Sequence, residues 1–392
     1  MKQISIIVKY FYPVAAGIET NIMETYTVLQ KKGWNIEVHT SRDTLTEKNV
    51  LKEKELIRGL TVIRYPFTKF AYFPEIDWDK VSIVALHNFD IFPHLKILSY
   101  VLALKILRRK KFQLVLTPHG GYTPEWSIFP PIQRVIKKIY HLTLGGILIN
   151  STVDVVRAVS DWEKDEIIKY GVKKSLVAVI PNGVEQEAYA NVDAHASDEI
   201  KERVKSFGKY IIQVGRVYPI KNYETTIRAL AKINSSIKFV IVGPEDHVMG
   251  KSDYKEELLH LAKSLKVENR VIFAGVLRGV DKYYIIGKAQ MMVHMAIWES
   301  FCNVVHEGLS QGLVCIVANN TALPYLIKNK INGFCVETRD MNAVANKIQY
   351  VLDNKNSKII REMEARNKIY GLENSWEKVA QEVDKLYTAL NQ

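Results

Sequence analysis

Short runs of β-branched and aliphatic residues alternate along the chain with longer segments in which apolar residues recur at helical spacing. This alternation is typical of parallel sheets whose strands are joined by crossover helices. The predicted strands are ISIIVKY, WNIEVHTS, LTVIRY, VSIVALH, QLVLTPH, VVRAVS and LVAVIPNG, followed by YIIQVGR, IKFVIVG, RVIFAG, MMVHMA, GLVCIVAN and GFCVE. We therefore predict an α/β protein with two doubly wound domains, one after the other.

The domain boundary is expected near residue 190, in a polar segment that lacks predicted strands. The last residues form an amphipathic pattern, which predicts a helix that returns to the first domain. The predicted domains are residues 1–189 with 373–392, and residues 190–372. A chain of 392 residues with 47% hydrophobic composition supplies enough apolar side chains for two cores.

Glu299 and Glu307 lie eight positions apart in HMAIWESFCNVVHEGLSQGLVCIVAN, which reads as a loop and then a helix that begins near Asn303. On one helix, a rise of ~1.5 Å per residue would separate their backbones by about 12 Å, too far for the roughly 5 Å carboxylate pair of a retaining glycosidase. We therefore expect them to contact different parts of one long ligand. Because unpaired N–H groups at the helix start suit a phosphate, the pattern indicates a nucleotide sugar.

Residues directly after predicted strands are further candidates, because ligands of open α/β sheets bind beyond the carboxyl ends of strands. Gly17 ends a turn over residues 15–17, where its backbone could approach a phosphate, although an ordinary strand-to-helix turn is the simpler alternative. His119 follows QLVLT and Pro118, and could be catalytic or a structural hydrogen-bonding group.

Two cations lie between the first predicted strand of the second domain and the helix that follows it. Arg216 follows the strand YIIQV, and Lys221 stands at the start of the next helix. Together with that helix N-terminus they could bind one diphosphate. Read without the strand context, they are two solvated surface charges, but the context favours ligand binding.

The net charge of +12 is concentrated in one region. Residues 96–138 hold nine Lys or Arg and one acid, Glu125. Within that region, the basic amphipathic segment 95–112 could lie on an anionic membrane surface, or it could be a crossover helix with a solvated basic end. Nucleic acid is a weaker interpretation, because no recognised binding motif accompanies the charge.

Other classes of protein are disfavoured by missing patterns. The segment VGPEDHVMGKS has Glu245 where a phosphate-binding P-loop needs glycine, and no Gly-x-Gly-x-x-Gly follows either first strand. Three cysteines without metal-ligand spacing argue against a disulfide framework. With no apolar run of eighteen residues and no signal segment, we expect a cytoplasmic protein.

The candidate segments occur in a defined order: AAGIE, TPHG, AVSDWEK, VIPNGVE, VGRVYPIKN, FVIVG, VIFAG, ESFCNVVHE and INGFCVE. As a set they resemble the retaining glycosyltransferases of the large family four, over essentially the whole chain. The resemblance implies the GT-B fold, in which two Rossmann-like domains face a central cleft. It also implies transfer of a sugar from a nucleoside diphosphate sugar to an acceptor hydroxyl, with no metal and no other cofactor.

Roles for individual residues follow from the same resemblance. Glu299 would lie against the donor sugar and Glu307 would accept hydrogen bonds from the ribose. Arg216 and Lys221 would neutralise the diphosphate as charge grows on it. The remaining matches are a histidine near the reacting face of the sugar, His119, and backbone N–H groups that bind the donor, those of Gly17, Asn303 and Val304.

Three positions depart from the family pattern. The first loop has Ala16-Gly17 where the family has paired glycines, Cys302 replaces a usual glycine, and Pro324-Tyr325 replaces Pro-Glu. The acceptor is left open between a soluble molecule and a glycan or lipid-linked glycan at a membrane, which the aromatic-rich segment from Tyr65 would suit. A non-catalytic nucleotide-sugar-binding protein and a GT-B epimerase are the alternative functions.

Overall fold

The computed structural model describes residues 2–14, 16–67, 72–91, 93–245 and 253–392. Its contacts divide the chain into two compact units, and each is considered by itself. Unit 1 contains the chain up to Asn182 together with Trp376–Gln392, and unit 2 is Gly183–Ser375. Parts of three sequence motifs lie outside the described residues: Ala15 of the first turn, residues 68–71 of the aromatic-rich segment and residues 246–252 of the P-loop-like segment.

The observed boundary falls after residue 182, before the polar segment in which the sequence placed it. The reason is that residues at and just before the start of that segment already bind unit 2. The Val184 N–H donates to the Asn374 carbonyl at 2.9 Å, and the Glu185 carboxylate pairs with Lys282 at 2.7 Å. The helix after Ser375 belongs to unit 1, as its amphipathic pattern predicted.

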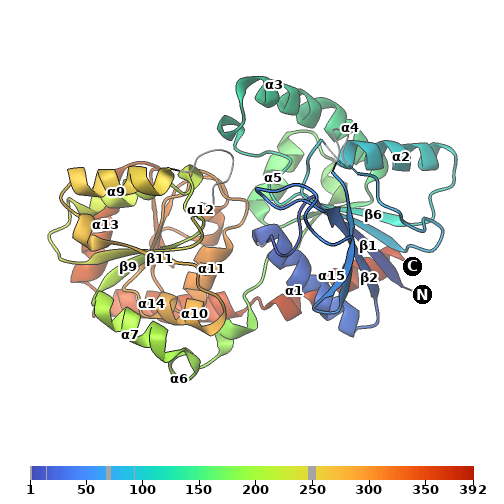
Figure 1. Ribbon diagram of the computed structural model, residues 1–392. Helices are drawn as coiled ribbons and strands as arrows, with labels where there is room; N and C mark the ends of the chain where they lie inside the picture. Colours follow the sequence, from blue (N-terminus) through green and yellow to red (C-terminus); the bar gives the residue numbers. More distant parts are fainter. Residues whose placement is uncertain (1, 15, 68–71, 92, 246–252) are drawn as a thin grey trace. The chain divides into compact units, whose positions relative to one another are not determined.

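The described part of unit 1 contains an eight-stranded sheet in the order β3-β4-β2-β1-β5-β6-β7-β8 (Figure 1). Its strands are β1 (Gln3–Ile7), β2 (Asn35–Ser41), β3 (Lys54–Ile57), β4 (Leu60–Tyr65), β5 (Ile83–His87), β6 (Gln113–Thr117), β7 (Val155–Ala158) and β8 (Val177–Val179). All neighbours pair in parallel except β3, an antiparallel edge strand. The sequence analysis missed β3 because KELI is polar and half exposed, without the apolar run of a buried strand.

Helices cover both faces of the unit 1 sheet. On one face α1 (Gly17–Lys31) and α15 (Trp376–Leu390) share a core with β1 and β2. On the other face the core includes residues of α2 (His94–Ile106), α4 (Gly146–Thr152) and α5 (Asp161–Lys169). Ile97, Leu98 and Val101 of α2 are buried there. The apolar side of this helix therefore packs in the core, as its crossover interpretation predicted.

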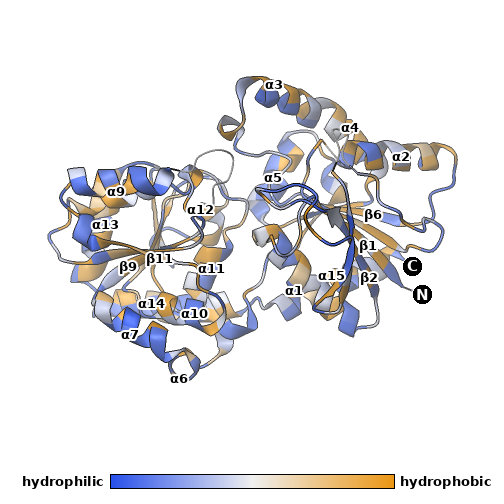
Figure 2. Ribbon diagram, viewed as in Figure 1, coloured by the Kyte–Doolittle hydropathy of each residue, from blue (hydrophilic) through white to orange (hydrophobic). Residues whose placement is uncertain are grey.

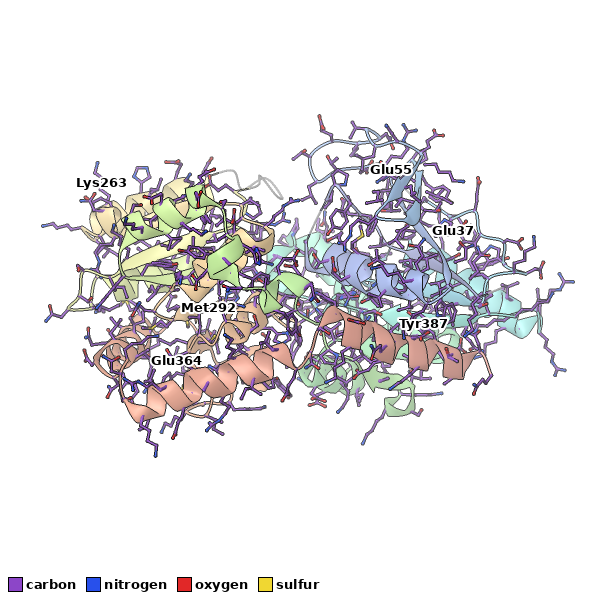
Figure 3. All side chains as sticks on the ribbon, turned by 90° about the horizontal axis from the view of Figure 1, so that it is seen from below. Glu37, Glu55, Lys263, Met292, Glu364 and Tyr387 are labelled. Atoms are coloured by element: carbon purple, nitrogen blue, oxygen red, sulfur yellow. The ribbon has the colours of Figure 1, made fainter. Side chains whose placement is uncertain are left out.

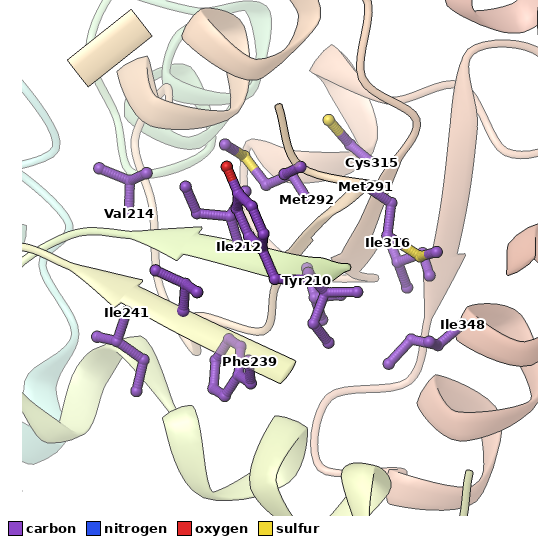
Figure 4. Close-up of a cluster of buried hydrophobic side chains, with 14 of the residues drawn as sticks. Tyr210, Ile212, Val214, Phe239, Ile241, Met291, Met292, Cys315, Ile316 and Ile348 are labelled. Carbon is purple, nitrogen blue, oxygen red and sulfur yellow. The ribbon is translucent and has the colours of Figure 1, made fainter. Parts of the chain in front are cut away.

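The described part of unit 2 contains a six-stranded parallel sheet in the order β11-β10-β9-β12-β13-β14. Its strands are β9 (Tyr210–Val214), β10 (Lys238–Val242), β11 (Val271–Gly275), β12 (Met292–His294), β13 (Cys315–Ala318) and β14 (Gly333–Val336). The helices are α6 (Val192–His195), α7 (Asp198–Phe207), α8 (Tyr223–Leu230), α9 (Tyr254–Ser264), α10 (Gly279–Gly287), α11 (Asn303–Ser310), α12 (Leu323–Leu326), α13 (Met341–Asp353) and α14 (Lys358–Leu372). Apolar side chains of these strands, among them Ile212, Phe239 and Ile316, form the core of the unit (Figure 4).

The order of the strands determines where a ligand can bind in unit 2. From β9 the chain adds β10 and β11 on one side, then returns to add β12, β13 and β14 on the other. The sheet therefore has a topological switch point between β9 and β12, which pair at Ile212 and Met292. Ligands of such sheets bind outside the strand ends at this point. The loops after β9 and β12 carry the predicted residues Arg216, Lys221 and Glu299.

All the strands predicted from the sequence overlap observed strands, and the helix expected near Asn303 begins at that residue. Among the described residues, no helix is long and apolar enough to cross a membrane.

Candidate active site

Backbone contacts hold the loops after β9, β10 and β12 together. A side chain at Gly243 would meet the Gly215 carbonyl oxygen at 2.0 Å, so glycine allows the loops after β10 and β9 to touch. Asn222, with a φ of 50°, ends the short turn Pro219–Lys221 in the left-handed conformation that asparagine tolerates. Its side-chain amide donates to the Met295 carbonyl at 2.9 Å, which joins the loop after β9 to the loop after β12.

Lys221, Glu299 and His294 form a cluster at this switch point, in which His294 is buried and the other two are partly buried. The Lys221 ammonium lies 2.6 Å from Oε1 of Glu299. His294 ends β12, and its Nε2 lies 2.9 Å from the same oxygen. The backbone N–H of Glu299 donates to the Thr321 hydroxyl at 3.0 Å. Lys221 and His294 therefore fix the carboxylate of Glu299, and Thr321 fixes its backbone.

Electrostatics keep the Glu299 carboxyl ionised. Burial raises its pKa, but the charge of Lys221 and the hydrogen bond from His294 lower it by more, to about 2. Burial lowers the pKa of Lys221, whereas Glu299 raises it and leaves it above its ordinary value. Burial lowers the pKa of His294, so a neutral imidazole donates its Nε2–H. The pair is thus a carboxylate held by an ammonium.

Arg216 adds a second positive charge to the cluster. It follows β9 by two residues, and its charge lowers the pKa of Lys221. The two cations therefore lie close enough to repel each other. A diphosphate bound between them would relieve that repulsion, because its negative charge attracts both cations.

The start of α11 lies in the same loop cluster. Cys302 precedes the helix with a φ of 80°, a conformation that favours glycine and strains other residues. This explains why the family pattern has glycine here. The first N–H groups of the helix, at Asn303 and Val304, come before the point where helical hydrogen bonding begins. They are the groups that the sequence assigned to a phosphate.

A metal interpretation of this cluster is weakened by Lys221. Ligand atoms of His294, Glu299 and Cys302 lie within 4.8 Å of one another, a set that could hold a cation. The Lys221 ammonium already contacts the carboxylate of that set. Its positive charge would repel a metal ion at this position. The expected independence from metals stays a prediction.

Glu307 lies in α11 and has a different cation. Its Oε1 pairs with Lys282 of α10 at 3.1 Å, and the same ammonium pairs with Glu185 at 2.7 Å. The other oxygen, Oε2, is buried and has no hydrogen-bond donor among the described residues. Burial raises the pKa of Glu307, and Lys282 lowers it by less. This oxygen could accept a hydrogen bond from a ligand hydroxyl, because a buried unpaired oxygen is costly.

Gly17 and His119 both lie in unit 1. Gly17 is exposed and is the first residue of α1. The residue before it, Ala16, has no side-chain oxygen to cap the helix, and its own N–H donates to Glu19 at 2.9 Å. His119 lies in the loop after β6 with a φ of 51°.

A chain of hydrogen bonds fixes the ring of His119. Its Nε2 lies 2.9 Å from Nδ1 of His87, whose Nε2 lies 3.0 Å from the Tyr26 hydroxyl. Tyr26 in turn contacts the Tyr387 hydroxyl at 2.7 Å, on α15 (Figure 3). Burial, together with the charge of Arg157, lowers the pKa of His119 to about 3. The ring of His119 is therefore neutral. Its Nδ1 has no hydrogen-bond partner among the described residues, so this atom can bind a ligand.

The glycine after His119 is held by a buried carboxyl. Glu163 of α5 accepts hydrogen bonds from the N–H groups of Gly120 and Val159. Burial raises the pKa of Glu163 to about 7, although those two donors and Arg157 lower it. Glu163 therefore sets the conformation of the loop that presents His119. The motif AVSDWEK contains this residue, but the sequence alone gave it no role.

Sequence reasoning located one half of this site better than the other. It placed Arg216, Lys221 and Glu299 together: Lys221 contacts Glu299, and Arg216 lies near enough for its charge to lower the pKa of Lys221. It missed the partners that fix the carboxylates and His119, namely His294, Lys282, Glu185 and His87. His294 could have been found from its position at the end of a buried strand. The other three come from distant segments that only the fold brings near.

Comparisons with known proteins identify the family and the fold of this chain. Residues 15–188 match the family described as Glycosyltransferase Family 4, and residues 195–371 match Glycosyl transferases group 1. A phosphatidylinositol N-acetylglucosaminyltransferase GPI3 subunit of Saccharomyces cerevisiae is 22% identical, over 99% of this chain and 83% of its own. A UDP-Gal:alpha-D-GlcNAc-diphosphoundecaprenol alpha-1,3-galactosyltransferase of Escherichia coli is 28% identical over 67% of each chain.

Among solved structures, Anabaena HepE in complex with UDP and glucose is similar in fold, with a TM-score of 0.76. It is 18% identical to this chain, and the match covers 99% of this chain and 100% of HepE. The activities of the relatives do not favour an epimerase or a binding protein without turnover. With its two Rossmann-like units and the two matching families, this chain belongs to family four of the glycosyltransferases and has the GT-B fold.

Proposed function

We propose that this glycosyltransferase moves a sugar from a nucleoside diphosphate sugar to a hydroxyl of a glycan or lipid-linked glycan, with retention of anomeric configuration. The observation that carries the donor assignment is the cluster of Arg216, Lys221 and Glu299 at the switch point of unit 2. Arg216 and Lys221 bind the diphosphate, with the N–H groups at the start of α11. Glu307 accepts hydrogen bonds from the ribose through its unpaired oxygen.

The state of Glu299 supports front-face transfer. A carboxyl with a pKa of about 2, held by an ammonium at 2.6 Å, is a weak base. It can orient the hydroxyls of the donor sugar but is poorly suited to take a proton from the acceptor. In the proposed reaction, the departing phosphate oxygen takes that proton as the new glycosidic bond forms. Arg216 and Lys221 stabilise the charge of the leaving diphosphate without a metal or other cofactor.

The proposal includes two contacts from unit 1, which follow from the family resemblance. The Gly17 N–H binds the diphosphate, and Nδ1 of His119 binds the sugar near its reacting face. The hydrogen-bond chain behind His119 supports this role, because it fixes which nitrogen faces outward. The proposed acceptor follows the Escherichia coli relative, whose name contains a sugar on diphosphoundecaprenol. A peripheral position at the cytoplasmic face of the membrane would suit such an acceptor.

The donor base is tested by thermal unfolding with UDP, GDP and ADP and their glucose conjugates. A nucleotide present at 100 times its dissociation constant stabilises the folded protein by about 2.7 kcal/mol. We expect UDP to protect most, since HepE was solved with UDP. The variant Arg216→Gln should lose the protection. Arg228→Gln, at an exposed position on α8, is the matched control and should keep it. Equal melting temperatures with and without every nucleotide would contradict the proposal.

A further inference from the structure

Helix α3 (Pro131–Tyr140) presents an uncovered apolar face. Its side chains Ile132, Val135, Ile136 and Ile139 follow the spacing of one helix face, and each is between 54% and 76% exposed. We call these four residues the α3 stripe. Only Tyr140 of this helix is buried. A helix of ten residues is marginal by itself, and an exposed apolar stripe usually marks a surface that binds something.

The apolar surface continues beyond the stripe. Leu142, Leu144 and Ile147 are exposed in the following turn (His141–Gly145) and in α4. The end of α4 lies beside the end of α2, because the Lys105 ammonium donates to the Ser151 carbonyl at 2.8 Å. Figure 1 shows α3, α4 and α2 on the same side of the unit 1 sheet, and in Figure 2 α3 has both orange and blue residues.

The charged side chains of this surface itself are basic. No acidic residue occurs between Glu125 and Asp154, whereas α3 carries Arg134, Lys137 and Lys138. Lys137 is paired with Asp90. Lys138 forms no ion pair with a described residue, and its ammonium lies 5.7 Å from the centre of the Trp126 ring.

The end of α2 adds further unpaired cations. Arg108 and Arg109, directly after Ile106 and Leu107, form no ion pair within the described chain. Both apolar residues are more than 60% exposed. Aliphatic side chains bordered by unpaired cations therefore occur at both ends of this surface.

We propose that the α3 stripe and the cations beside it dock on an anionic lipid membrane. Aliphatic side chains enter the boundary between headgroups and acyl chains, while lysine and arginine stay at the level of the anionic headgroups. A protein partner for such a surface would need acidic groups to match its charge. A second copy of this chain offers the same positive charge and would be repelled. The inference rests on the proposed function for its purpose, which is to bring unit 1 to a lipid-linked acceptor.

The experiment is sedimentation of the full chain with vesicles of phosphatidylcholine, alone or with phosphatidylglycerol. We expect binding to the anionic vesicles that weakens with salt. The double variant Ile132→Ser with Ile136→Ser should bind the anionic vesicles at least roughly tenfold more weakly, because two large aliphatic groups no longer enter the lipid. The variant Lys138→Gln should weaken binding to anionic vesicles by a few-fold.

The matched control is Ile359→Ser with Ile369→Ser, two aliphatic residues of α14 that are 60% and 67% exposed. It should bind vesicles like the original protein. Nucleotide protection is measured on every variant, so that a failed donor assignment and a failed membrane assignment are distinguished. Equal sedimentation of stripe and control variants would overturn the proposal. The proposal would also be overturned if the original protein formed a dimer that does not bind vesicles and the stripe variant lost that dimer.

Discussion

At the scale of single residues, two glutamates of the same loop and helix have opposite surroundings. Glu299 is held by Lys221 and His294, and its pKa is lowered to about 2. Glu307 shares Lys282 with Glu185, and its pKa is raised. Glu299 already accepts from two donors at its Oε1 before any ligand binds, whereas Glu307 keeps a buried oxygen without a donor among the described residues. This difference supports a role in orientation for Glu299 and a role in binding for Glu307.

Substitution of each glutamate by alanine should separate these roles. We expect Glu307→Ala to raise the dissociation constant of the nucleotide about tenfold, since a hydrogen bond to a charged group contributes roughly 1.5–3 kcal/mol. Glu299→Ala should leave nucleotide affinity within a few-fold but lower kcat by about 10². Calorimetric titration and initial rates measure the two effects. Glu362→Ala, on the exposed side of α14, is the control, and the reverse pattern would mean that the roles are exchanged.

At the scale of elements, α11 is positioned by its crossing with α14. A side chain at Gly371 of α14 would meet the backbone nitrogen of Ser310 at 2.2 Å, so the two helices touch through their backbones. The amide of Asn367, on the same helix, donates to the carbonyls of Leu313 and Asn332 at 2.8 Å. The position of α11, which carries Glu307, is therefore set by α14, a helix distant from it in sequence.

The variant Gly371→Ala should lower the stability of unit 2 by about 2 kcal/mol or more, because overpacking against backbone cannot relax easily. It should also weaken nucleotide binding, since α11 must move. Chemical unfolding and nucleotide titration measure the two effects. Gly287→Ala in α10 is the control: its added carbon would meet only Gln311, at 3.5 Å, and it should be neutral or slightly stabilising. Similar losses in both variants would contradict this account of the crossing.

At the scale of the molecule, both units bury histidines in neutral form. Burial lowers the pKa of each of the following from its ordinary value: His39, His87, His94, His119, His141, His294 and His306. For His39, His141 and His306 the value falls to about 4. The raised pKa values of Glu163 and Glu307 have the opposite effect on stability as the pH falls, but these two groups are fewer than the histidines.

Stability should therefore fall as the pH decreases from about 6.5 to about 4. Over this range the unfolded chain binds protons at these histidines and the folded chain does not, so protonation favours unfolding. Each histidine whose pKa falls to about 4, namely His39, His141 and His306, contributes on the order of 1 kcal/mol or more to this loss. Urea unfolding at several pH values measures it. A midpoint that stays constant between pH 7.5 and pH 4.5 would contradict the prediction.

The sequence by itself determined the class of fold and the strands that build it. Periodicity is a local property, and buried parallel strands such as YIIQV and KFVIV are apolar throughout because both faces are covered. It also determined that Arg216, Lys221 and Glu299 follow strands. A polar edge strand such as β3 lacks this signal.

Only the tertiary structure decided which groups meet. The pairing of Glu307 with Lys282 and Glu185, and the chain from Tyr387 through Tyr26 to His87, join segments far apart in sequence. Such contacts depend on strand order and helix crossing, which local patterns do not encode. The tertiary structure also determines which groups are buried, and therefore the charge that each carboxyl and imidazole carries.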